Sequence, residues 1–109
     1  MEIHKTEIFA PVVVILKADT LDEAIKIIND HQYANAGSIY TQNGHYARKF
    51  KLEAQCGMIG VNVGIPAPVP FLPFGGMNDS MICDIKMQGK SALSFYTHDK
   101  VIVERYWQE

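Results

Sequence analysis

The chain has 109 residues, of which 48% are hydrophobic and 20% are charged, and its net charge is −2 at pH 7. This length allows at most one domain, and the apolar content favours a packed core over disorder. The net charge argues against nucleic acid and anionic membranes as partners, and no apolar run is long enough to span a bilayer. With no apolar signal segment at the N-terminus and few cysteines, we expect a reduced, cytoplasmic protein.

The first element that the sequence predicts is a buried strand at 12–16, where every residue is apolar and most are β-branched. Pro11 suits the start of a strand, because its missing N–H costs least there. A helix is expected to begin after Thr20. In a capping box, the Thr20 hydroxyl accepts a hydrogen bond from the Glu23 N–H, and the Glu23 carboxylate accepts one from the Thr20 N–H. Helical spacing places four apolar residues on one face: Leu21, Ala24, Ile25 and Ile28.

Two more strands and another helix are expected next. Residues 37–41 are typical of a short strand, Asn43 can cap a helix from about 45 to 54, and 58–63 is typical of a third strand. Strands that alternate with helices imply right-handed crossovers and a parallel sheet. We therefore predict the α/β class, with a small three-layer βαβαβ parallel sheet.

The second half of the chain has a different composition. Residues 64–81 are expected to form a long Pro-rich loop, because most of the prolines and two adjacent glycines lie there. A loop of this length inside a compact domain is usually functional or disordered, and its Phe and Leu content argues against disorder. A helix interrupted by Gly89 is expected at 87–96. A final strand is expected at 100–107, where it either extends the sheet or leaves an exposed edge.

The residues by themselves do not complete an active site. Cys56 and Cys83 lack a helix N-terminus or a positive neighbour that would stabilise a thiolate, so we interpret both as buried or half-buried bystanders. The glycines at 57–64 lie along a strand and do not form the dinucleotide-binding pattern. The histidines are scattered singly, with no spacing typical of a metal site: His4, His31, His45 and His98.

Several short motifs occur in a fixed order along the chain. They are EIFAPV at 7–12, TLDEAI at 20–25, ARKF at 47–50, GVNV at 60–63, the prolines at 66, 68 and 70, and FYT at 95–97 followed by Lys100. This order resembles the C-terminal part of the aldehyde dehydrogenase superfamily, most of all its CoA-acylating methylmalonate-semialdehyde dehydrogenases. The resemblance covers nearly all of the chain but only the last part of the family's length. We therefore interpret residues 1–109 as a single partial domain.

The resemblance implies roles for four side chains. Glu7 is expected to accept hydrogen bonds from the nicotinamide ribose hydroxyls of NAD, and Phe9 to pack against the nicotinamide. Phe74, in the PFGG stretch, is expected to line the substrate tunnel, with Phe71 beside it. Simpler interpretations stay open: core packing for Phe71, and a strand entry with a hydrophobic staple for Glu7 and Phe9. The final strand resembles the family's oligomerisation strand.

The chain also departs from the family. The catalytic cysteine, the oxyanion asparagine, the general-base glutamate and the NAD domain lie upstream of the matching segment, so neither Cys56 nor Cys83 corresponds to the nucleophile. Ala10 replaces a usual glycine, and Gly64 stands where the subfamily commonly has proline. Residues 75–79 lean toward the general superfamily form of the loop.

We therefore expect the C-terminal fragment of an NAD-dependent, CoA-acylating methylmalonate-semialdehyde dehydrogenase. NAD is the expected cofactor of the parent enzyme and CoA its acyl acceptor, whereas the isolated chain is expected to be inactive and to bind neither tightly. The expected partners are the remainder of the dehydrogenase and further copies joined through the C-terminal strand. Two alternatives are a free-standing, non-catalytic oligomeric module from a truncated gene, and a small βαβ regulatory domain that binds a metabolite.

Overall fold

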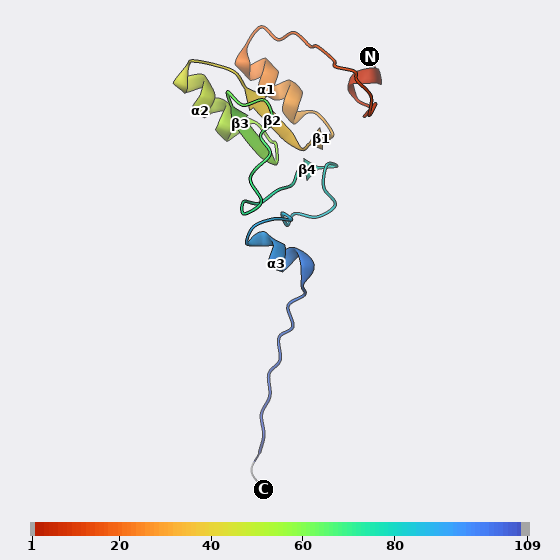
Figure 1. The fold of residues 1–109 in the computed structure, drawn as a ribbon, viewed down its shortest axis with the longest axis vertical. Coiled ribbons are helices and arrows are strands. Elements are labelled where there is room, and N and C mark those ends of the chain that lie inside the picture. The colour runs from red at the N-terminus through yellow and green to blue at the C-terminus, as the bar shows by residue number, and fades with distance from the viewer. Residues whose placement is uncertain (1, 108–109) are drawn as a thin grey trace.

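The computed structural model describes residues 2–107 as an elongated molecule, with most of its helices and strands at one end (Figure 1). In chain order its elements are η1 (Glu2–His4), α1 (Leu21–Asn29), β1 (Tyr33–Ala34), β2 (Ala36–Ile39), α2 (Gly44–Glu53), β3 (Met58–Val61), β4 (Met77–Asn78) and α3 (Ser91–Tyr96). Within these residues, no helix has the length and apolar character needed to cross a bilayer.

The core lies where α1 and α2 pack over the parallel strands β2 and β3. These strands pair in register from Ala36 opposite Met58 to Ile39 opposite Val61. Buried side chains form a small cluster with half-buried ones around it: Ile25, Phe50 and Ala54, then Leu21, Ile28, Ile39 and Ile59. The α/β class is thus confirmed, as are the two helices and the second and third strands of the prediction.

Side chains cap both helices as the sequence predicts. Thr20 Oγ1 accepts from the Glu23 N–H at 3.1 Å, and Asn43 Oδ1 accepts from the His45 N–H at 2.9 Å. The second hydrogen bond of the expected capping box has a different donor. The Glu23 carboxylate oxygen Oε2 accepts from the Asp19 N–H at 2.9 Å and not from the Thr20 N–H. Both helix starts are therefore fixed by residues close in sequence.

The predicted strand at 12–16 is wrong for the chain taken by itself. This segment is extended but pairs with no strand among residues 2–107, so the parallel sheet has two strands, and the expected three-layer βαβαβ sheet does not form. Val13 and Ile15 are 85% and 84% exposed. A strand needs a neighbour for its N–H and C=O groups, and the described residues supply none beside this segment.

The second half of the chain also differs from the prediction. β4 lies inside 64–81 and pairs antiparallel with β1, with Ala34 opposite Met77. The helix expected at 87–96 begins only at Ser91, after Gly89 takes a left-handed φ of +62°. The strand expected at 100–107 does not form, because this segment projects away from the body as an extended tail (Figure 1).

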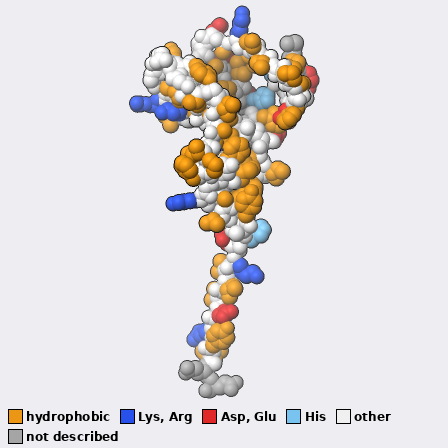
Figure 2. All heavy atoms as spheres, viewed as in Figure 1, with side chains coloured by type: hydrophobic (Ala, Val, Ile, Leu, Met, Phe, Trp, Pro, Cys, Tyr) orange, Lys and Arg blue, Asp and Glu red, His pale blue; other side chains and the backbone are white. Residues whose placement is uncertain are grey.

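The chain exposes more surface than a self-contained domain does. Its accessible area is 9349 Å², whereas a compact monomer of 12.2 kDa exposes about 6,000 Å². Its radius of gyration is 19.6 Å, against about 13 Å for a compact chain of this length. Figure 2 shows apolar side chains over the body and along the tail. The chain therefore leaves apolar faces exposed, and another protein surface can cover them.

We expect Asn29→Ala to lower the free energy of unfolding by about 1–2 kcal/mol. Asn29 Nδ2 donates to Glu53 O at 2.9 Å, and Asn29 Oδ1 accepts from the Gln55 N–H at 2.8 Å, so one side chain ties the end of α1 to the end of α2. Urea denaturation followed by circular dichroism measures the loss. Gln42→Ala, at an exposed turn residue, is the control and is expected to cost less than about 0.5 kcal/mol. Equal stability of the two variants would contradict this account.

Candidate functional site

The segment before α1 holds Glu7 and Phe9 on the molecular surface. It arches from η1 to α1 (Figure 1), and both side chains are exposed, Phe9 by 95%. Phe9 has a left-handed φ of +48°, and the Val12 N–H donates to Ala10 O at 2.6 Å in the turn that follows. Left-handed backbone is uncommon for an aromatic residue and is concentrated at ligand sites. The turn presents a carboxylate and an aromatic ring on one short segment.

This segment fits one edge of a dinucleotide site. An exposed carboxylate such as that of Glu7 is an acceptor that suits the hydroxyl donors of a ribose. The Phe9 ring is free to pack on a flat heterocycle, because little of the chain covers it. Phosphate groups are bound by helix N-termini or glycine-rich loops, and this segment contains neither. The residues present therefore fit the nicotinamide ribose end of NAD, and the phosphates need groups from elsewhere.

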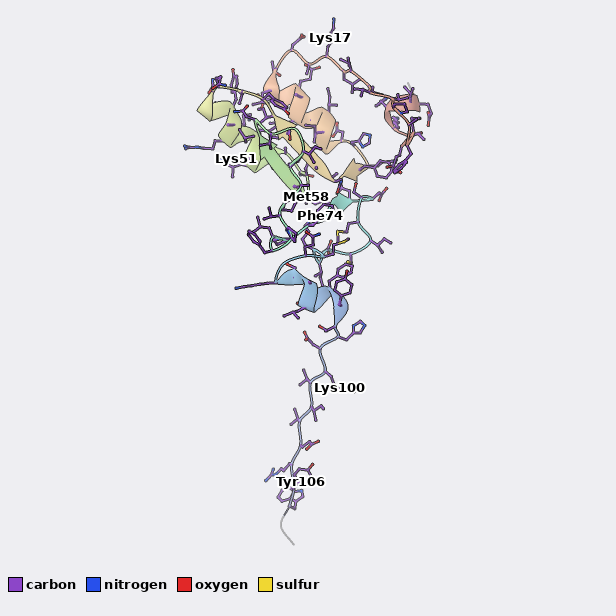
Figure 3. All side chains as sticks on the ribbon, in the orientation of Figure 1. Lys17, Lys51, Met58, Phe74, Lys100 and Tyr106 are labelled. Carbon is purple, nitrogen blue, oxygen red and sulfur yellow. The ribbon has the colours of Figure 1, made fainter. Side chains whose placement is uncertain are left out.

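Phe74 lies in a loop that packs against the start of β3. Its side chain is half-buried, and its carbonyl accepts from the Met87 N–H at 3.0 Å. Figure 3 shows Phe74 close to Met58, the first residue of β3. Phe71 is 75% exposed, so the core-packing interpretation is wrong for the chain by itself. Both rings are thus open to a ligand or to another protein surface.

Among residues 2–107, no hydrogen bond links Glu7 or Phe9 with Phe71 or Phe74. Lys17, at the end of the arching segment, lies on the far side of α1 and the strands from Phe74 (Figure 3). The other end of the segment lies nearer to β4. Gln32 Nε2 donates to Lys5 O at 3.0 Å, and the Asp79 N–H, which directly follows β4, donates to Gln32 O at 3.1 Å.

The two cysteines are both free thiols with different surroundings. Cys56 is half-buried, and burial raises the pKa of its thiol, which lowers the thiolate fraction at neutral pH. Cys83 is exposed, which corrects the expectation that it is at least half-buried, and its Sγ lies 3.7 Å from Ile85 O. Neither arrangement activates a nucleophile.

His31 has a structural role that its place in the sequence does not reveal. Its Nδ1 accepts from the Tyr33 N–H at 3.0 Å, which leaves Nε2 to donate to His4 O at 2.9 Å. Gln32 Nε2 adds a bond to Lys5 O at 3.0 Å, so the segment after α1 anchors η1. Among residues 2–107, no three His, Cys, Asp or Glu side chains are grouped so that they could hold a metal ion.

Comparison with known proteins identifies close relatives. Malonate-semialdehyde dehydrogenase 1 of Geobacillus kaustophilus is 46% identical over 106 residues, which are 97% of this chain and 22% of the relative. A Sinorhizobium meliloti 1021 structure, described as a methylmalonate-semialdehyde dehydrogenase complexed with NAD, superposes with a TM-score of 0.86 at 38% identity, covering 100% of this chain and 22% of that one. For methylmalonate-semialdehyde dehydrogenase of Oceanimonas doudoroffii the TM-score is 0.84 at 35% identity, covering 97% and 22%.

The chain therefore spans about 22% of the length of the relatives that it matches. The model of the aldehyde dehydrogenase family matches residues 1–102, which include both pairs of predicted site residues. Because this match extends over nearly the whole sequence, the chain belongs to the aldehyde dehydrogenase family.

Proposed function

We propose that this chain is the C-terminal part of an NAD-dependent, CoA-acylating methylmalonate-semialdehyde dehydrogenase. It supplies one wall of the cofactor site, one wall of the substrate site and a strand for assembly. The observation that supports the proposal is 46% identity, over 97% of the chain, to a malonate-semialdehyde dehydrogenase of which the chain spans 22%. By itself the chain is inactive in this proposal, because the family's nucleophile and NAD domain are supplied by the rest of the enzyme.

The proposed substrate is a short 3-oxo carboxylic acid. The sequence relative is named for malonate semialdehyde and the two solved structures for methylmalonate semialdehyde. These substrates differ by one methyl group, which an apolar pocket discriminates by only about 1–3 kcal/mol. Both therefore fall within the proposed class, and the shape of the wall around Phe74 decides between them.

In this proposal the residues of the chain bind and orient the reactants. NAD supplies the hydride acceptor when it is bound, and CoA takes up the acyl group. Glu7 accepts hydrogen bonds from the ribose hydroxyls and fixes their position, while Phe9 covers one side of the nicotinamide. Phe74 and Phe71 form an apolar wall that excludes water from the aldehyde.

The proposed partners follow from the uncovered segments. The remainder of the dehydrogenase covers 12–16, and a second copy joins the tail at 100–107, where Val101 and Val103 are 89% and 91% exposed on an extended backbone. The same tail favours the second candidate function, a free-standing oligomeric module without catalysis. A cytoplasmic location stays our prediction, and it is supported by the two free thiols.

The chain alone is expected to produce no NADH from methylmalonate semialdehyde, NAD and CoA. A chimera in which this chain replaces the matching 106 residues of the Geobacillus kaustophilus enzyme is expected to produce NADH, because that enzyme supplies the missing nucleophile and NAD domain. The absorbance of NADH measures both. Turnover by the chain alone would refute its inactivity. A folded but inactive chimera, with a defined oligomer of the chain alone in light scattering, would favour the free-standing module.

In the chimera, Glu7→Gln is expected to raise the KM for NAD about tenfold, which corresponds to about 1.4 kcal/mol, because charge-assisted hydrogen bonds to the ribose are lost. The KM for the aldehyde is expected to stay unchanged. Glu2→Gln removes the same charge from the exposed η1 and is the control, with both KM values unchanged. Equal KM values for NAD in the two variants would show that Glu7 does not contact the cofactor.

In the chain alone, Cys83 is expected to react with iodoacetamide faster than Cys56 at neutral pH. Cys83 is exposed, whereas burial raises the pKa of the Cys56 thiol and so lowers its thiolate fraction. The Cys56→Ser chain is therefore labelled faster than the Cys83→Ser chain, as mass spectrometry can measure. The reverse order would identify Cys56 as an activated thiol and contradict the proposed inactivity.

A further inference from the structure

The loop that carries Phe74 is held by two successive residues from a later part of the chain. Lys86 Nζ donates to Gly75 O at 2.8 Å and to Gly76 O at 2.5 Å. The next residue, Met87, donates its N–H to Phe74 O at 3.0 Å. Three consecutive carbonyls, those of residues 74–76, are therefore bound by neighbouring donors.

The start of β3 confines the same loop from another direction. A Cβ added to Gly57 would lie 2.1 Å from Gly75 O and 2.6 Å from Gly76 Cα, so only glycine allows this approach. Gly75 itself has φ +153°, which glycine adopts readily and other residues do not. The loop is thus confined between the start of β3 and the segment that contains Lys86.

The ammonium of Lys86 suits this position for two reasons. Adjacent glycines give a chain more conformational freedom than any other pair, so a loop that must present Phe74 in one place needs an anchor. Hydrogen bonds from a cation are stronger than neutral ones, and an ammonium has three donors, enough for both carbonyls. The Lys86 side chain is half-buried, which limits competition from water.

We propose that Lys86 is the positioning residue of the Phe74 loop, and that it thereby fixes where the apolar wall stands in the aldehyde site. The placement of the loop is a property of this chain. The expected effect on the KM for the aldehyde rests on the proposed function. Lys86 does not touch the substrate in this proposal and acts only through the carbonyls of Gly75 and Gly76.

Amide hydrogen exchange of the 109-residue chain tests the placement of the loop. Lys86→Met removes the ammonium and keeps a long stem, and the Met87 amide, corrected for its intrinsic rate, is expected to exchange about tenfold faster. The Ala47 amide, which donates to Asn43 O in α2, is expected to keep its rate. Lys86→Arg restores protection because it keeps the donors, and Lys90→Met, at an exposed lysine of the same segment, changes neither amide.

Two results of that experiment would overturn the proposal. An unchanged rate at Met87 in Lys86→Met would show that the ammonium does not hold the loop. Equal acceleration at Met87 and Ala47 would show that Lys86 stabilises the whole chain and does not position the loop.

Steady-state kinetics of the chimera test whether Lys86 affects the binding of the aldehyde. Lys86→Met is expected to raise the KM for methylmalonate semialdehyde about tenfold with the KM for NAD unchanged, and Lys86→Arg to reverse the rise. An unchanged KM for the aldehyde, or an equal rise in both KM values, would overturn the effect on the substrate wall. If the unsubstituted chimera makes no NADH, the proposed function fails, and the exchange rates still decide whether Lys86 places the loop.

Discussion

The packing of α1 and α2 over the β2–β3 pair is the constraint on which the rest of the structure depends. Ile25 and Phe50 are 4% and 3% exposed and belong to one cluster, and few other side chains of residues 2–107 are buried so completely. This cluster fixes β3, and the residue before β3 is Gly57, against which Gly75 and Gly76 pack. The position of the Phe74 loop therefore follows from a core of very few side chains, with Lys86 as its second support.

Features set by residues close in sequence could be predicted, and features set by distant ones could not. The caps at Thr20 and Asn43 use backbone groups within one turn, so the motif itself contains both partners. An apolar run such as 12–16 favours burial but does not specify the strand that would pair with it. The helix expected at 87–96 begins only at Ser91, after Gly89 with its left-handed φ, and a Cβ added to Gly89 would lie 2.4 Å from Phe71 O, a contact that the local sequence does not specify.

For the candidate site, the resemblance located residues, and only the structure shows what surrounds them. Asn62 of the GVNV motif has φ +57°, which asparagine tolerates, and its side-chain amide pairs with the backbone of Thr41. Its Oδ1 accepts from the Thr41 N–H at 2.9 Å and its Nδ2 donates to Thr41 O at 3.0 Å, so the side chain extends the strand pairing beyond Val61. The contacts of Lys86 could not be predicted either, because its acceptors lie ten or more residues away and no sequence spacing indicates them.

The two extended segments differ in pattern, and the difference favours a part of a larger sheet over a free-standing module. Successive residues of an extended chain point to opposite faces, and in 12–16 both faces are apolar, with Val13 85% and Val14 40% exposed. This composition is typical of strands with helices on both sides of their sheet. The tail at 100–107 instead carries charges such as Glu104 among its apolar residues, as edge strands do. A second copy of the chain can cover an edge, whereas 12–16 needs a sheet with a helix layer on each face. This pattern agrees with the proposed partners, in which the rest of the catalytic domain covers 12–16 and a neighbouring subunit covers the tail.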